Sequence, residues 1–315
     1  MGSTSMYPTD GLCALKDVVV VAINYRVNVF GFLTTGTDTL PGNMGLWDQQ
    51  LALLWIRDNI KDYGGDSGSV TIFGESAGGR SVTFQMFSPH NDRSVFQRAI
   101  TESGSALAQT FLHRDPSEVT NHVSQRTNCP VNDQFVTCLQ GKSTLELLKS
   151  TVGIAKPYPF YPIVDGDFLP HDLGQLLADF TKDGINQDIH ERAGNFPSYD
   201  LLGGWTDQEG MLYMRYLLAA SKRLINSDLT DGVSDQVLTA ALRHYPFYKY
   251  GGDNSITDLV VSMFKDFYLR GPFLTISDGR SMEDKRVEMY LDISGELRSF
   301  LLCAKEHFWF WPVIG

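Results

Sequence analysis

Residues 70–79 read VTIFGESAGG, and this stretch decides how the fold of the 315-residue chain is interpreted. Its first four residues are apolar or β-branched, which is typical of a strand buried inside a sheet. The next residues fit the pattern Gly-x-Ser-x-Gly, and those that follow are compatible with a helix. A serine on such a strand-to-helix turn has a strained backbone and an exposed Oγ atom, so its neighbours two positions away must lack a Cβ atom. The pattern therefore predicts an elbow in which Ser76 is a nucleophile held between Gly74 and Gly78.

The residues on either side of Ser76 have expected roles of their own. The N–H group of Ala77 would lie at the start of the helix, where it can donate a hydrogen bond to a developing oxyanion. Glu75 would add negative charge to the surroundings of the nucleophile. The competing interpretation is a glycine-rich turn with an incidental serine, and the strand and helix context argues against it.

Strand-like and helix-like segments alternate around this turn. The strand-like segments are 18–23 (VVVVAI), 70–73 (VTIF) and 98–101 (RAIT), and the helix-like segments are 47–60 and 81–87. The apolar residues at helical spacing in the first helix are Trp47, Leu51, Leu54 and Trp55. We interpret residues 30–45, which are rich in Gly, Thr and Pro, as a loop. The alternation predicts an α/β fold with a mostly parallel sheet and helices on both faces.

Beyond residue 115 the pattern turns helical. The clearer segments are 145–148, 173–180 and 210–224, followed by a strand-like segment at 287–291. No internal repeat or long linker divides the chain, so we expect a single domain over residues 1–315.

Composition excludes several classes of function. Lys and Arg number 26 and Asp and Glu number 37, which gives a net charge of −11. Such an acidic chain repels phosphate, so neither nucleic acid nor an anionic membrane is an expected partner. The longest apolar run has six residues, far too few to span a membrane. The Cys and His residues show no metal-binding spacing, and we expect neither a metal nor a cofactor.

Several motifs together carry a family resemblance. They are Asn24-Tyr25-Arg26, Gly31-Phe32-Leu33, residues 42–49 (GNMGLWDQ), Trp55, Gly64-Gly65-Asp66 and residues 73–79 (FGESAGG). In this order they resemble the type-B carboxylesterase, or cholinesterase-like, family, which includes cholinesterases, bile-salt-activated lipase and the neuroligins. The resemblance runs from about Gly2 to Leu291. Two departures stand out: Asn28 replaces the usual Gly, although Asn tolerates a positive φ, and Arg80 replaces a small residue just after the elbow.

The resemblance implies an α/β-hydrolase fold and a carboxylic ester as substrate, either a small molecule or a lipid. It also implies a disulfide between Cys129 and Cys138, and hence a secreted or endoplasmic-reticulum location. The spacing of these two cysteines by itself says only that they would close a small loop in an oxidising compartment. We expect the chain to be a partial one: it has no signal peptide and no upstream Gly-rich loop of the kind that supplies further oxyanion donors. Which ester it takes and which oligomer it forms are not readable.

A serine nucleophile needs a base and an orienting acid, in the chain order Ser, acid, His. Residues 205–210 (WTDQEG) resemble the acid motif of the family, in which Glu209 is the match and Asp207 the fallback. His307 lies in about the place expected for the base, and the alternative is that it belongs to a misread or alternatively spliced tail. We interpret the other six histidines as surface or packing residues, and the aromatic run at 308–311 as core rather than a membrane or partner contact. The competing function is a neuroligin-like binding protein, or an inactive fragment, that keeps the fold without catalysis.

Overall fold

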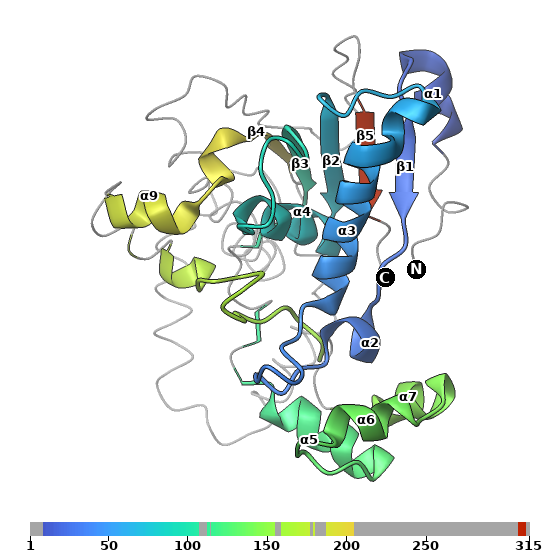
Figure 1. Cartoon of the computed structure of the whole chain (residues 1–315), viewed down its shortest axis with the longest axis vertical. Coiled ribbons are helices and arrows are strands. Elements are labelled where there is room, and N and C mark those ends of the chain that lie inside the picture. The colour runs from blue at the N-terminus through green and yellow to red at the C-terminus, as the bar shows by residue number, and fades with distance from the viewer. Residues whose placement is uncertain are drawn as a thin grey trace, which may run out of the picture.

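The computed structural model describes residues 9–106, 112–113, 115–154, 159–176, 179 and 187–204, together with the backbone of residues 308–312. Within this part, five strands form one sheet in the order β1-β5-β2-β3-β4 (Figure 1). The strands are β1 (Val20–Ile23), β2 (Val70–Glu75), β3 (Arg98–Glu102), β4 (Asp200–Gly204) and β5 (Phe308–Pro312). All the neighbouring pairs are parallel, which confirms the expected sheet.

The position of β5 was not predicted. Its backbone pairs with β1 through Val20 and Trp309 and with β2 through Val70 and Phe308. The sequence placed this aromatic run in the core but assigned it no strand. Sequence pattern cannot reveal such a pairing, because strand partners far apart in the chain leave no local signal.

The helices of the described residues are α1 (Asp10–Lys16), α2 (Asn28–Phe32), α3 (Met44–Asn59), η1 (Ile60–Tyr63), α4 (Ala77–Phe87), α5 (Ser117–Thr127), α6 (Phe135–Gln140), α7 (Thr144–Ser150), α9 (Gln187–Ala193) and η3 (Phe196–Ser198). The interpretation of residues 30–45 as a loop was wrong at both ends, since α2 reaches residue 32 and α3 begins at residue 44. Asn28 has the positive φ expected where the family has Gly, at 56°. Residues 173–176 are helical as predicted, whereas residues 210–224 and 287–291 lie outside the described residues.

The predicted apolar face of α3 was wrong in part, since Trp47 and Leu54 pack against the core but the other two residues do not. Leu51 and Trp55 are 66% and 47% exposed. The buried face carries Leu46, Leu53 and Ile56, and it includes two glutamines, Gln49 and Gln50. Burial on this helix therefore follows its contact with the neighbouring helix rather than the hydrophobicity of each residue.

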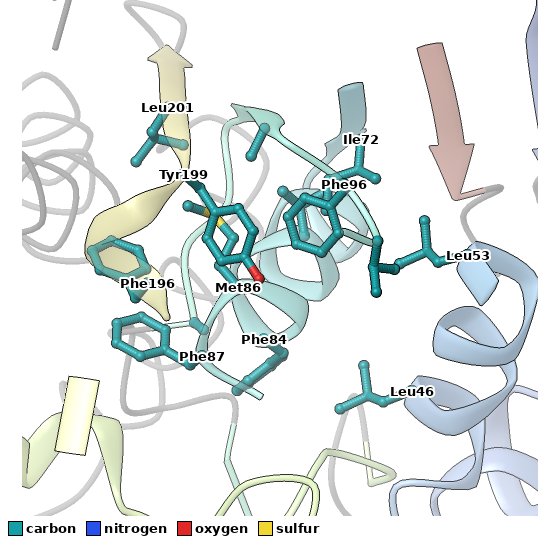
Figure 2. Packing of buried hydrophobic residues seen from close by; sticks show 14 of the residues in the cluster. Leu46, Leu53, Ile72, Phe84, Met86, Phe87, Phe96, Phe196, Tyr199 and Leu201 are labelled. Carbon is teal, nitrogen blue, oxygen red and sulfur yellow. The ribbon is translucent and has the colours of Figure 1, made fainter. Parts of the chain in front are cut away.

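The main core lies between α3, α4 and the strands (Figure 2). Phe96 and Tyr199 stack with ring centroids 4.4 Å apart, beside Phe87 and Phe196 at 4.2 Å. These rings join the segments before β3 and β4 to α4. The core thus fixes α4 against the sheet, and the turn that carries Ser76 lies where β2 meets this helix.

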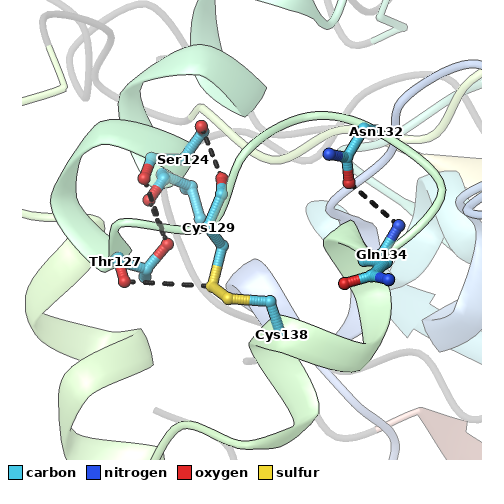
Figure 3. Close-up of a disulfide and its surroundings, with 7 residues drawn as sticks. Ser124, Thr127, Cys129, Asn132, Gln134 and Cys138 are labelled. Atoms are coloured by element: carbon cyan, nitrogen blue, oxygen red, sulfur yellow. Dashed lines mark hydrogen bonds between the residues drawn. A yellow bond between two sulfur atoms is a disulfide. The ribbon is translucent and has the colours of Figure 1, made fainter.

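A second, smaller core joins α5, α6 and α7, which lie away from the sheet, to Val29 and Leu33 at α2 (Figure 1). Cys129 and Cys138 form a disulfide there, with Cα atoms 5.6 Å apart, and the Ser124 hydroxyl donates to the Cys129 carbonyl at 2.6 Å (Figure 3). The predicted disulfide is confirmed. Among the described ranges, no helix combines the length and the apolar character needed to cross a membrane.

Candidate functional site

Ser76 lies between the last residue of β2 and the first residue of α4. Its backbone has φ 55° and ψ −112°, a region that a non-glycine residue adopts at a cost of about 1–3 kcal/mol. Two hydrogen bonds hold it: the Ser76 N–H donates to the Glu102 carbonyl at 2.8 Å, and the Ser76 carbonyl accepts from the Arg80 N–H at 3.1 Å. The strained turn that the sequence predicted is present.

This turn is possible because two nearby residues are glycines, which have no side chain. A Cβ atom on Gly74 would lie 2.6 Å from the carbonyl carbon of Gly78, and one on Gly104 would lie 2.1 Å from the carbonyl oxygen of Ser76. Both neighbours are backbone atoms, which cannot rotate away. Sequence analysis identified Gly74 but missed Gly104. The signal was a glycine two residues after the end of the strand that follows the elbow.

Ala77 is the exposed first residue of α4. The first N–H groups of a helix have no acceptor within the helix, so they point outward as donors. The positive end of the helix dipole favours negative charge at the same place. The start of α4 is therefore arranged to stabilise an anion beside Ser76.

Two carboxylates flank the elbow at the end of the sheet. Glu75 and Glu102 are paired in the register of β2 and β3. Glu102 is exposed, yet the surrounding protein removes part of its hydration, which raises the pKa of its carboxyl. The negative charge of the two carboxylates favours the approach of neutral or cationic molecules from solvent over anionic ones, whereas the N–H donors of α4 act only on a group directly beside Ser76. The one nearby cationic residue that the sequence singled out, Arg80, lies half-buried one helical turn after Ser76.

Glu209, its fallback Asp207 and His307 lie outside the described residues. The described strands next to them give two constraints. β4 ends at Gly204, level with the end of β2, so the last described residue before Glu209 lies at the edge of the sheet that carries Ser76. Phe308, which follows His307, pairs with Val70 at the other end of β2, and six residues of strand span roughly 20 Å. Both assignments stay predictions.

Three histidines of the described residues make hydrogen bonds away from Ser76. His90 pairs with Asp167 at 2.7 Å, and the rings of His113 and His122 bond the carbonyls of Pro159 and Val152. These contacts fit the packing or surface roles expected from the sequence. In the described ranges no group of three or more His, Cys, Asp or Glu side chains is placed to hold a metal ion.

Comparison with known proteins agrees with this geometry. Residues 1–294 match the carboxylesterase family. Cholinesterase 1 of Branchiostoma lanceolatum is 38% identical over 68% of this chain and 60% of its own length. Bile salt-activated lipase of Bos taurus is 35% identical over 67% of this chain and 34% of its own. Neuroligin-3 of Mus musculus is 31% identical over 84% of this chain and 30% of its own length. The chain therefore spans between about a third and three fifths of these relatives.

A solved structure shares the architecture. The crystal structure of a Geobacillus stearothermophilus carboxylesterase at pH 6.2 superposes with a TM-score of 0.68 and 26% sequence identity. The match covers 89% of this chain and 56% of that enzyme. The fold is accordingly that of the α/β-hydrolases.

Proposed function

The chain belongs to the carboxylesterase family, and from that premise we propose that it hydrolyses carboxylic esters through an acyl-enzyme on Ser76. The Ser76 Oγ attacks the ester carbonyl carbon, and its proton passes to a histidine base and then to the leaving alcohol. His307 is the candidate from the sequence, and it can serve only if its ring reaches Ser76 from the opposite end of β2, where β5 begins. Glu209 orients the imidazole. Water then attacks the acyl group, again with the histidine as base, and releases the acid. The Ala77 N–H donates to the oxyanion of both tetrahedral intermediates.

One observation carries this proposal: the strained φ of Ser76 at the junction of β2 and α4. Strain of this kind persists only where the surrounding structure enforces it, and it clusters at functional sites. Here it places a hydroxyl beside the donors of a helix N-terminus. Neither feature is required for an ordinary turn.

A fluorophosphonate probe applied to the 315-residue chain tests the proposal, because such probes react with activated serines. We expect a single labelled residue, Ser76, and no labelling of Ser76→Ala. Glu209→Gln and His307→Gln should each reduce the labelling rate at least 100-fold, roughly the scale of positioned proton transfer. Asp207→Asn is the matched control for the acid and should leave the rate unchanged. Equal labelling of wild type and Ser76→Ala would overturn the assignment.

A second candidate is a non-catalytic binding protein of the same fold. The similarity to Neuroligin-3 over 84% of the chain favours it. It predicts that the wild-type chain, although folded by circular dichroism, is labelled no faster than Ser76→Ala. The probe experiment therefore separates a catalytic chain from both non-catalytic alternatives, the binding protein and the inactive fragment.

We also propose an oxidising compartment for the protein, since the Cys129–Cys138 disulfide is stable there. The substrate would be a small-molecule or lipid ester. The acidic charge of the chain supports no nucleic-acid role. Peptide mapping without reductant of material from a secretory host should find both sulfurs joined.

A further inference from the structure

Four buried polar side chains connect α3 to α4 and to the turn after it. We call Ser81, Gln49, Gln85 and Asn91 the polar clamp. Asn91 donates to the Gln85 side-chain oxygen at 2.8 Å, Gln85 donates to the Gln49 oxygen at 3.1 Å, and Gln49 donates to the Ser81 hydroxyl at 3.1 Å. All four residues are at most 7% exposed.

Further bonds tie the clamp to the backbone. The Gln85 amide also donates to the Leu46 carbonyl in the first turn of α3 at 2.9 Å, and the Asn91 amide donates to the Gln85 carbonyl at 3.0 Å. The clamp thus joins the N-terminal half of α3 to the middle and the C-terminal turn of α4, and it reaches past the end of α4.

Joining two helices through buried polar side chains requires that those side chains lose their hydration. A buried amide is tolerated only when it is hydrogen-bonded, and apolar side chains of similar shape hold helices together without that requirement. Hydrogen bonds differ from apolar contacts in being directional, so they fix the rotation and the axial position of one helix against the other. The polar clamp therefore restricts the rotation and the axial position of α4 more than the apolar contacts of that helix do.

The position of α4 matters because the nucleophile precedes its first residue. Ser81 lies five residues after Ser76, in the second turn of the helix. A shift of α4 along its axis would lengthen the bond from the Arg80 N–H to the Ser76 carbonyl and let the φ of Ser76 relax from 55°. It would also move the Ala77 N–H.

We infer that the polar clamp is a positioning device: it holds the N-terminus of α4 so that Ser76 stays in its strained conformation with the Ala77 N–H beside it. None of its four residues touches the reacting atoms. The inference concerns the geometry of the elbow, and only its effect on reaction rate rests on the proposed function.

Hydrogen exchange on the full chain tests the geometry without any need for activity. The Ser76 and Arg80 amides are both hydrogen-bonded, so they report on the elbow. In Gln85→Met, which keeps the length of the side chain, we expect both amides to exchange at least about tenfold faster relative to the Ile72 amide in β2. Ile56→Val, a buried change on the same face of α3 that leaves every clamp atom in place, is the control and should leave that ratio unchanged.

Ser81 supplies a second, milder pair of variants in case Gln85→Met does not fold. Ser81→Ala removes the hydroxyl that accepts from Gln49, and Ser81→Thr keeps it. We expect faster exchange of the two elbow amides in Ser81→Ala and rescue in Ser81→Thr. Unchanged exchange ratios in both Gln85→Met and Ser81→Ala, or equal changes in Ile56→Val, would overturn the inference.

The rate of fluorophosphonate labelling tests whether the polar clamp also affects the reactivity of Ser76. Displacement of the reacting groups by about 1 Å costs on the order of 100-fold in rate. We therefore expect the maximal labelling rate of Gln85→Met to fall 10- to 100-fold with an unchanged half-saturating probe concentration. A wild-type chain that is not labelled would refute the proposed function, and the exchange ratios would still decide the inference.

Discussion

The elbow leaves no room for a side chain at residue 74, which makes Gly74→Ala a demanding test of the site. The added Cβ atom would lie 2.6 Å from the Gly78 carbonyl carbon, 2.8 Å from its oxygen and 2.9 Å from its Cα. Non-bonded carbon atoms prefer about 3.5–4.0 Å. The start of α4 must therefore move away from the end of β2 by about 1 Å.

The cost of that movement follows from packing. Forcing one extra carbon into a well-packed site typically costs about 1–3 kcal/mol. The higher end applies here because all three neighbours belong to the backbone of the same residue. The displaced turn carries Ser76, so we expect the fluorophosphonate labelling rate to fall about 100-fold as well.

Urea unfolding and labelling kinetics on the same preparations measure both effects. Gly11→Ala is the matched control: it is the same substitution in α1 with nothing within 4 Å of the new Cβ, and it should raise stability by about 0.5–1 kcal/mol. If Gly74→Ala unfolds at the same urea concentration as wild type and is labelled at the same rate, the close approach of β2 and α4 at the elbow is not real.

Three further predictions concern stability. Tyr199→Phe should raise the free energy of unfolding by about 1 kcal/mol, because the Tyr199 hydroxyl is buried without a hydrogen-bond partner in the described structure; a loss in calorimetry would contradict this. Replacing both Cys129 and Cys138 with Ser should lower the free energy of unfolding by about 2–3 kcal/mol in urea titrations, because the disulfide restricts the small loop in the unfolded chain. Burial would raise the pKa of the Asp48 carboxyl, but hydrogen bonds from Arg26 outweigh it and hold that pKa below its ordinary value. The pair of Asp48 and Arg26 therefore stabilises the fold above about pH 4, and this stabilisation is lost as the pH falls through the folded pKa of Asp48. Asp48→Asn should lower the free energy of unfolding by about 0.5–1 kcal/mol at pH 7. Unfolding curves recorded at acid pH should show a smaller difference between the variant and the wild type.

The elbow was predictable because its chemistry is local. Glycines at fixed offsets from Ser76, a β-branched run before it and a helix after it follow from the backbone that an exposed nucleophile needs. The strands β1, β2 and β3 were predictable for the same reason, since each contains a short run of apolar or β-branched residues. The positive φ of Asn28 was likewise foreseen from residue type.

The parts that depend on tertiary contact were not predictable. Periodicity assigned Leu51 and Trp55 to the core and overlooked Gln49, because it scores each residue alone, whereas a glutamine can be buried when a neighbouring helix supplies its partners. Gly104 escaped attention because the atom it makes room for belongs to residue 76. The acid and base assignments to Glu209 and His307 rest on the resemblance and on chain order, and the single domain over residues 1–315 stays a prediction from the lack of an internal repeat or long linker.

The place of β5 in the sheet has a consequence for how the protein is made. Residues 308–312 fill the position between β1 and β2, whose residues leave the ribosome much earlier. At about 5–20 residues per second, translation from residue 75 to residue 308 takes roughly 10–50 s. Throughout that interval both strands present a bare edge to the cytosol or the translocation channel, and bare edges pair readily with other chains. Nascent protein should therefore depend on a chaperone until β5 arrives.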